Sequence, residues 1–165
     1  YGSQQHFSSG QYRIVDVEFL DRSGQRTMRF RFGEPLRLRV TYECLLDEVP
    51  AASCGLAVAF TSTPEHVAVM YFNTNYPHSD DEIARYDSLP FRHYRGRRGV
   101  IEAHLPAVQL KAGEYLVSLG ILPNQQEFHQ FYEYRHLAYR VAVLANGYPE
   151  PSVFYANVDW SHGPA

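Results

Sequence analysis

Histidines are the residues of this sequence whose type most readily suggests metal chemistry. The chain has eight of them, together with two cysteines. A metal site normally needs histidine with carboxylate or thiolate partners at short, regular spacing. No tight ligand pair of that kind is formed by His93, His104, His129 and His136. We therefore predict no metal site and no metal cofactor.

The other catalytic patterns are missing or incomplete. Residues 80–82 are three adjacent acids, whereas a glycosidase needs two carboxylates that face each other about 5 to 9 Å apart. A phosphate-binding loop of nucleotide hydrolases needs Gly-Lys followed by Ser or Thr, but the only lysine, Lys111, is followed by Ala-Gly. No Gly-x-Ser-x-Gly motif of a serine nucleophile occurs. We expect no catalytic residues, no cofactor and no enzyme activity in this domain.

Tyrosines mixed with amide, imidazole and guanidinium groups favour binding instead. Aromatic residues make up 15% of the chain, with 13 Tyr, 10 Phe and 1 Trp. Sugar rings present C–H faces that lie against aromatic rings, and hydroxyls that need donors and acceptors. Two stretches supply such a mixture, the loop at residues 73–94 and the approach to a strand at 137–144. The candidate carbohydrate-binding residues are Asn73, Tyr76, His78, Arg92, Tyr94, Tyr132, Tyr134 and His136.

Strand parity predicts the orientation of the second stretch. Alternation carried back from the strand puts Tyr132, Tyr134, His136 and Arg140 outward, and Leu137, Tyr139, Val141 and Val143 inward. An open surface of this kind buries few groups. We therefore expect weak binding, with a dissociation constant on the order of 0.1 to 1 mM.

The elements that must position these residues are strands. Period-two alternation is clearest at residues 36–44, where Leu36, Leu38, Val40, Tyr42 and Cys44 share one side. Further strands are predicted at 12–20, 27–32, 55–62, 67–72, 99–105, 114–122, 137–144 and 152–160. At most one short helix is expected, at residues 80–86. Many short strands between Gly, Pro, Asn and Asp clusters predict an all-β fold, either a two-sheet antiparallel sandwich or a barrel.

Length and charge limit the function classes. The 165 residues suit one domain with one core. The net charge of −3 gives no general attraction to phosphate backbones, so we expect no nucleic-acid partner despite the basic patch at residues 92–98. The apolar stretches are far shorter than the roughly 20 residues that span a bilayer. Cys44 and Cys54 are expected to be free thiols.

The two ends of the chain suggest how the domain is bounded. The sequence begins at Tyr1 without Met and without the features of a signal peptide. We expect a piece of a longer protein, with residues 1–11 as a linker remnant from a preceding domain and 12–165 as the sandwich. Pro149 and Pro151 stiffen the connection before the last apolar run. Residues 147–160 are therefore a candidate C-terminal strand exchanged within a homodimer.

Several blocks resemble the C-terminal domain of Wzt-type proteins, the ATP-binding subunits of ABC transporters that export O-antigen polysaccharide. The first is FSSGQYRIVDVEFLDRSGQ, followed by FGEPLRLRVTYE. Farther along, LPAVQLKAGEYLVSLGI is similar to that family's Leu-rich strand, Gly turn and Tyr-Leu strand, and LAYRVAV to its late sandwich strand. The order and spacing of the blocks also agree.

The resemblance implies an Ig-like or jelly-roll β-sandwich that is non-catalytic and recognises lipid-linked O-antigen polysaccharide at its non-reducing end. It further implies a homodimer in the cytoplasm, peripheral to the inner membrane, that acts with a nucleotide-binding domain of the same chain and a membrane permease. The alternatives are an Ig-like protein-interaction module, whose exposed tyrosines would contact another protein, and a polysaccharide-processing enzyme. Fold alone does not separate the three, because sandwiches host all of them.

Overall fold

The computed structural model describes residues 6–47, 54–73, 97–123 and 131–145. In these ranges the chain forms β-strands and no helix, so none of the described residues belongs to a helix that could cross a membrane. The strands are β1 (His6–Ser8), β2 (Tyr12–Leu20), β3 (Arg29–Arg31), β4 (Leu36–Cys44), β5 (Cys54–Ser62), β6 (Ala68–Asn73), β7 (Arg98–Leu105), β8 (Gly113–Pro123) and β9 (Glu133–Leu144).

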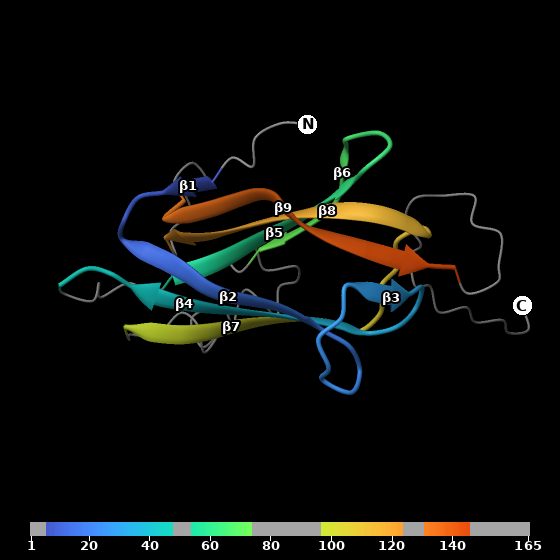
Figure 1. Cartoon of the computed structure of the whole chain (residues 1–165), viewed down its shortest axis with the longest axis horizontal. Coiled ribbons are helices and arrows are strands. Elements are labelled where there is room, and N and C mark those ends of the chain that lie inside the picture. Colours follow the sequence, from blue (N-terminus) through green and yellow to red (C-terminus); the bar gives the residue numbers. More distant parts are fainter. Residues whose placement is uncertain (1–5, 48–53, 74–96, 124–130, 146–165) are drawn as a thin grey trace, which may run out of the picture.

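The strands form two sheets that lie as layers, one above the other (Figure 1). The larger sheet has the order β1-β9-β8-β5-β6, and β3 pairs in parallel with the far end of β9. The smaller sheet has the order β2-β4-β7. All other neighbours are antiparallel. The predicted all-β fold with two antiparallel sheets is confirmed.

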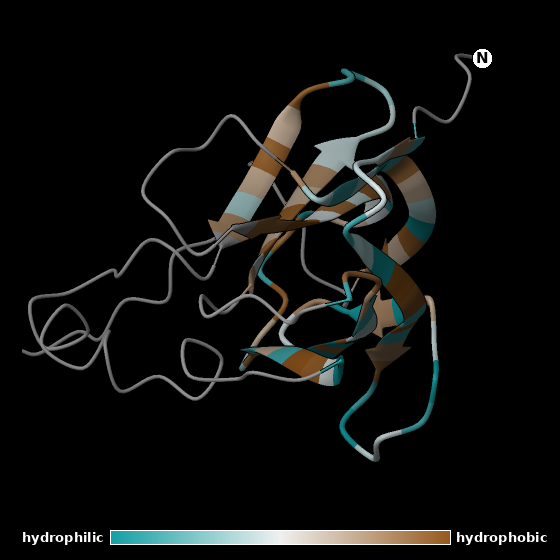
Figure 2. Ribbon diagram, turned by 90° about the vertical axis from the view of Figure 1, so that its left-hand side faces the viewer, coloured by the Kyte–Doolittle hydropathy of each residue, from teal (hydrophilic) through white to brown (hydrophobic). Residues whose placement is uncertain are grey.

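Alternation of buried and more exposed residues along the strands explains why the two sheets pack face to face. In β4, every second residue from Leu36 to Cys44 is buried and the residues between them are half-buried. Apolar and polar bands alternate in the same way along the ribbons (Figure 2). Because the pleat sends successive side chains to opposite faces, one face of each sheet is apolar and packs against the other sheet.

The core lies between the two layers and is rich in aromatic residues. Phe30 and Phe60 are among its largest fully buried side chains, and Tyr12, Tyr42 and Tyr115 are buried with them. Cys44 and Cys54 are also buried, and both are free thiols. Burial is the largest cause that raises the pKa of the Cys54 thiol, to about 11.

Two elements differ from their predicted bounds in a way that matters for function. β9 begins at Glu133, four residues before the predicted start at Leu137. Residues 6–8 lie within the expected linker remnant, but they form β1 on the edge of the larger sheet. The predicted helix at 80–86, the predicted strand at 152–160 and the exchanged segment 147–160 lie outside the described residues.

Candidate functional site

The outer face of the larger sheet carries a row of residues drawn from five strands. The strand pairings place Phe7 of β1 opposite Tyr134 of β9, Tyr134 opposite Gly120 of β8, Gly120 opposite Ala57 of β5, and Ala57 opposite Asn73 of β6. Directly paired residues of antiparallel strands lie on the same face. With about 4.8 Å between neighbouring strands, the row from β1 to β6 spans about 19 Å.

An aromatic cluster stands at the β1–β9 end of this row. The Phe131 and Tyr134 rings have centroids 4.7 Å apart. Phe131 lies directly over Gly120, where a Cβ atom would come within 2.5 Å of the Phe131 ring and 2.9 Å of the Glu133 carbonyl oxygen. Glycine at position 120 therefore makes room for Phe131. Phe7 completes the cluster and is 53% exposed.

His136 belongs to the cluster and is the first residue of a bulge in β9. Residues 136–138 all oppose Ser118, because the register shifts between Val117 and Leu119. Leu137 adopts a left-handed φ of 49° there, and its N–H donates to Ser118 Oγ over 2.8 Å. The His136 ring lies beside that of Tyr134, two residues earlier on the same face, with the ring centroids 5.9 Å apart.

The hydrogen bonds around His136 orient its imidazole. Nδ1 lies 3.3 Å from the Tyr134 hydroxyl and 3.4 Å from Ser118 Oγ. Ser118 Oγ already accepts from Leu137, so its own proton is available to donate to Nδ1. An Nδ1 that accepts from these hydroxyls leaves the proton of the neutral ring on Nε2. Nε2 is then a donor for a ligand.

The middle of the face carries small residues, and a further tyrosine stands at the far edge. Ala59 of β5 pairs with Ser118 on one side and with Tyr71 of β6 on the other. Tyr71 is 52% exposed. Side chains are therefore long at both edges of the face and short on β5 and β8 between them, where Ala57 and Ser118 are buried. We call Phe7, Tyr71, Phe131, Tyr134 and His136 the outer-face aromatics.

The opposite side of the β1–β9 ladder is a buried polar network that fixes β9 to the smaller sheet. Glu133 is buried, with 1% of the residue exposed. Its carboxylate accepts hydrogen bonds from the Ile14 N–H over 2.6 Å and from Arg135 Nε over 3.0 Å. Arg135 also donates to the Ile14 carbonyl over 2.6 Å and to the Tyr139 hydroxyl over 2.8 Å. His6 Nε2 lies 3.0 Å from Glu133 Oε1.

The network contacts β2 where the β2–β4 ladder is irregular, because the backbone of Ile14 bonds to Glu133 and Arg135 there. The register shifts between Ile14 and Asp16, so β2 is irregular where Glu133 and Arg135 reach it. Burial lowers the pKa of Arg135, but its bonds to Tyr139 and Glu133 outweigh that effect and the pKa is raised. The guanidinium stays charged, and the paired groups hold β9 in place beneath the outer-face aromatics.

Tyr132 does not lie where parity predicted it. Its ring stacks on Tyr12 of the smaller sheet, with centroids 4.5 Å apart and planes at 27°, and it packs half-buried against the core. Burial raises its pKa. Tyr132 precedes the first residue of β9, so the alternation of the strand does not control it. The predicted outward orientation of Tyr132 is therefore wrong.

The remaining predicted residues divide into three groups. Tyr134 and His136 lie on the outer face, so their predicted orientation is confirmed, and Arg140 faces outward in an ion pair with Glu114. Asn73 is the last residue of β6 and is linked to Tyr134 by the pairings through Ala57 and Gly120. Four lie outside the described residues: Tyr76, His78, Arg92 and Tyr94. Phe7, Tyr71 and Phe131 were not predicted, because only the strand pairings and the contact with Gly120 reveal their place.

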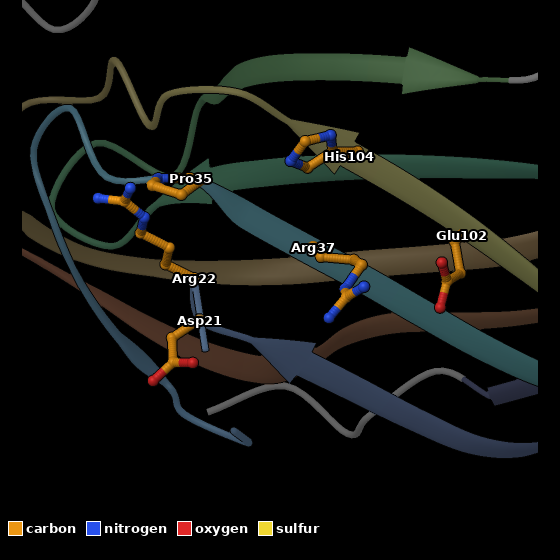
Figure 3. A pocket seen from close by; sticks show the side chains of 6 residues that line it. All are labelled: Asp21, Arg22, Pro35, Arg37, Glu102 and His104. Carbon is orange, nitrogen blue, oxygen red and sulfur yellow. The ribbon is translucent and has the colours of Figure 1, made fainter. Parts of the chain in front are cut away.

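A polar cleft of about 310 Å³ lies on the smaller sheet and is a weaker candidate (Figure 3). It is lined by Asp21, Arg22, Pro35, Arg37, Glu102 and His104. The Glu102 carboxylate accepts from Arg39 Nε over 2.5 Å, and the Asp21 carboxylate accepts from the Ser23 and Gln25 N–H groups. Among the described residues that line this cleft there is no Phe, Tyr or Trp for a sugar to stack on, and the imidazole of His104 is the one aromatic ring. Among the described residues, no group of three His, Cys, Asp or Glu could hold a metal ion.

Comparison with known proteins supports one family. A family model described as the Wzt C-terminal domain matches residues 3–156. A crystal structure of the C-terminal domain of Wzt has a TM-score of 0.75 and 13% identity, and the alignment covers 98% of this chain and 90% of that one. At this identity the structural likeness shows the fold. An immunoglobulin-like protein from Pseudomonas aeruginosa has a TM-score of only 0.37 and 12% identity, with 87% and 100% coverage. No curated protein matches the sequence.

Proposed function

The chain belongs to the Wzt C-terminal domain family, and on that premise we propose that it is a non-catalytic carbohydrate-binding domain that recognises O-antigen polysaccharide. The observation that carries the proposal is the row on the outer face, in which Phe7 and Tyr134 stand side by side with His136 next to them. The glycan is held at its non-reducing end, because an end residue reaches the half-buried Tyr134 and His136 with fewer neighbouring sugars in the way.

The chemistry of the outer-face aromatics suits a sugar. The Phe7 and Tyr134 rings offer apolar surface for the C–H face of a pyranose. The Tyr134 hydroxyl and the Nε2–H of His136 offer donors at the edge of that surface for the sugar hydroxyls. Such a site has few buried polar contacts. A dissociation constant on the order of 0.1 to 1 mM follows for one site, and a dimer would raise the avidity.

The same family membership supports a transport context. We propose that the domain acts in the cytoplasm at the inner membrane, with a nucleotide-binding domain of the same chain and a membrane permease, on a lipid-linked glycan. A homodimer that exchanges residues 147–160 belongs to this proposal. Sedimentation of the chain with and without residues 147–165 tests the dimer: a dimer that becomes a monomer on truncation supports exchange, and two monomers exclude it.

The binding proposal is tested by calorimetric titration of the chain with O-antigen polysaccharide purified from the source organism. We expect binding by the parent and at least a fivefold loss of affinity in Tyr134→Ala. The matched control is Val100→Ala, because Val100 is 54% exposed but lies on the smaller sheet. Its affinity should equal that of the parent.

The outcome of the titration also separates the alternative function. If no polysaccharide of the source organism binds, while the parent chain captures a protein that Tyr134→Ala does not capture, the Ig-like protein-interaction module replaces the present proposal. Thermal unfolding of each variant shows whether it is still folded, so that loss of the fold is not mistaken for loss of binding.

A further inference from the structure

Strand β1 is held to the rest of the molecule by few groups. It has three residues, and all three are exposed. On its inner side His6 Nε2 lies 3.0 Å from Glu133 Oε1, and just after it the Ser9 N–H donates to the Tyr132 carbonyl over 2.7 Å. A three-residue edge strand with exposed backbone belongs to the least stable parts of a fold. With only three positions paired to β9, we expect β1 to detach at a smaller cost in free energy than a longer strand.

Phe7 gains little from its own packing in the docked strand. Its side chain points to the outer face opposite Tyr134, and 53% of the residue stays exposed. Cβ atoms of such directly paired residues lie about 4.5 to 5.5 Å apart, so a ligand on this face can reach both side chains at once. A ligand that lies across both rings would cover apolar area that the protein alone leaves in water.

We propose that β1 is a detachable wall of the glycan site, in which Phe7 contacts the glycan and docking of β1 is coupled to glycan binding. This inference rests on the proposed function and adds to it a binding residue and a coupling. The bound species is a pyranose whose C–H face lies across Phe7 and Tyr134. When β1 leaves β9, the site keeps Tyr134, Phe131 and His136 but loses the Phe7 half of the stacking surface.

The coupling is reciprocal by thermodynamic necessity. A glycan that binds better when β1 is docked stabilises the docked state, and anything that pulls β1 away weakens glycan binding by the same factor. If binding requires docked β1, glycan at ten times its dissociation constant reduces the opening of β1 about tenfold. His6 and Phe7 act on opposite sides of the strand, so the docking contact and the ligand contact are separable by mutation.

Hydrogen–deuterium exchange of the full chain tests the coupling, with the purified O-antigen polysaccharide as the probe. We expect the amides of residues 6–9 to exchange up to about tenfold more slowly at saturating polysaccharide. Phe7→Ala should bind several-fold more weakly and show little of this protection. His6→Ala should also bind more weakly, because it loosens docking and leaves the outer face intact. His104→Ala, an exposed histidine of β7, is the control and should behave as the parent.

Each outcome distinguishes the coupling from the proposed function. If the polysaccharide binds but exchange at residues 6–9 is unchanged, and Phe7→Ala binds as the parent does, the coupling is wrong and the carbohydrate function stands. If the polysaccharide binds none of the chains, the proposed function fails and the coupling fails with it.

Discussion

Phe7 and Tyr134 are directly opposed residues of the β1–β9 ladder, and they present two aromatic rings on the same face of the larger sheet. The residues next to them in the ladder, His6 and Glu133, contact each other on the opposite face. One short pairing thus builds an aromatic surface on one side and a buried polar network on the other. Each side gives predictions that solution measurements can check.

The contact between Gly120 and Phe131 predicts a stability cost for the smallest substitution. In Gly120→Ala the new Cβ would lie 2.5 Å from the Phe131 ring, so Phe131 must move. We expect a loss of about 1–3 kcal/mol in the free energy of unfolding, together with weaker polysaccharide binding. Gly113→Ala is the control, because nothing lies within 4 Å of its Cβ and its cost should stay within about 0.5 kcal/mol. Equal urea midpoints for the two variants would contradict this packing.

The buried network around Glu133 predicts that its charge is important for stability. Glu133→Gln keeps the size of the side chain but removes the countercharge of half-buried Arg135. Removing one partner of a buried pair costs about 3–5 kcal/mol, and the amide oxygen that remains should reduce this to about 3 kcal/mol. Glu43→Gln breaks the exposed pair with Arg13 and should cost less than about 1 kcal/mol. Chemical denaturation of both variants checks the difference, and similar losses would show that the network is not a stabilising link.

The raised pKa of Cys54 predicts lower stability in alkali. The thiol titrates near pH 9.0 when unperturbed and at about 11 in the folded chain. Between these values the unfolded chain holds fewer protons than the folded one, so stability falls as the pH rises from about 9 to 11. Burial also raises the pKa of Tyr12 and Tyr132 from 10.0, so they act with the same sign from about pH 10 upward. Cys54→Ala should have a shallower decline over this window, and a decline as steep as that of the parent would refute the assignment.

The hydroxyls beside His136 predict its tautomer. With Nδ1 accepting from Tyr134 and Ser118, the neutral ring carries its proton on Nε2. Long-range ¹H–¹⁵N spectra of the neutral ring should show the Nε2–H form for His136. In Ser118→Ala one donor is lost, and the preference for this form should weaken. A dominant Nδ1–H form in the parent would mean that the ring offers an acceptor to the ligand instead.

The fold was largely predictable because strand alternation is a local signal. β2 and β4 have the predicted bounds, β5 and β7 differ from theirs by one residue at one end, and β6 and β8 by one residue at each end. The start of β9 was missed, because the bulge opposite Ser118 depends on a partner strand and interrupts the pattern. β1 was missed because three residues are too few to carry a period, and its existence depends on pairing with a strand at the far end of the sequence.

The candidate site was predictable only in part for the same reason. Parity correctly oriented Tyr134 and His136, which lie within β9, and failed for Tyr132, which lies just before it. Phe7 and Phe131 belong to the site because Phe7 pairs with Tyr134 and Phe131 packs over Gly120. No local sequence pattern encodes these contacts. The roles of all these residues in binding remain predictions.

The central claim is that the outer face of the larger sheet binds O-antigen polysaccharide, and backbone chemical-shift mapping tests it most directly. A ¹H–¹⁵N titration of the full chain with the purified polysaccharide should shift the amides of Phe7, Gly120, Phe131, Tyr134 and His136, with fast exchange at a dissociation constant on the order of 0.1 to 1 mM. The amides of Arg37, Glu102 and His104, on the polar cleft of the smaller sheet, should stay in place. Shifts confined to that cleft, or no shifts at any concentration up to several millimolar, would contradict the account.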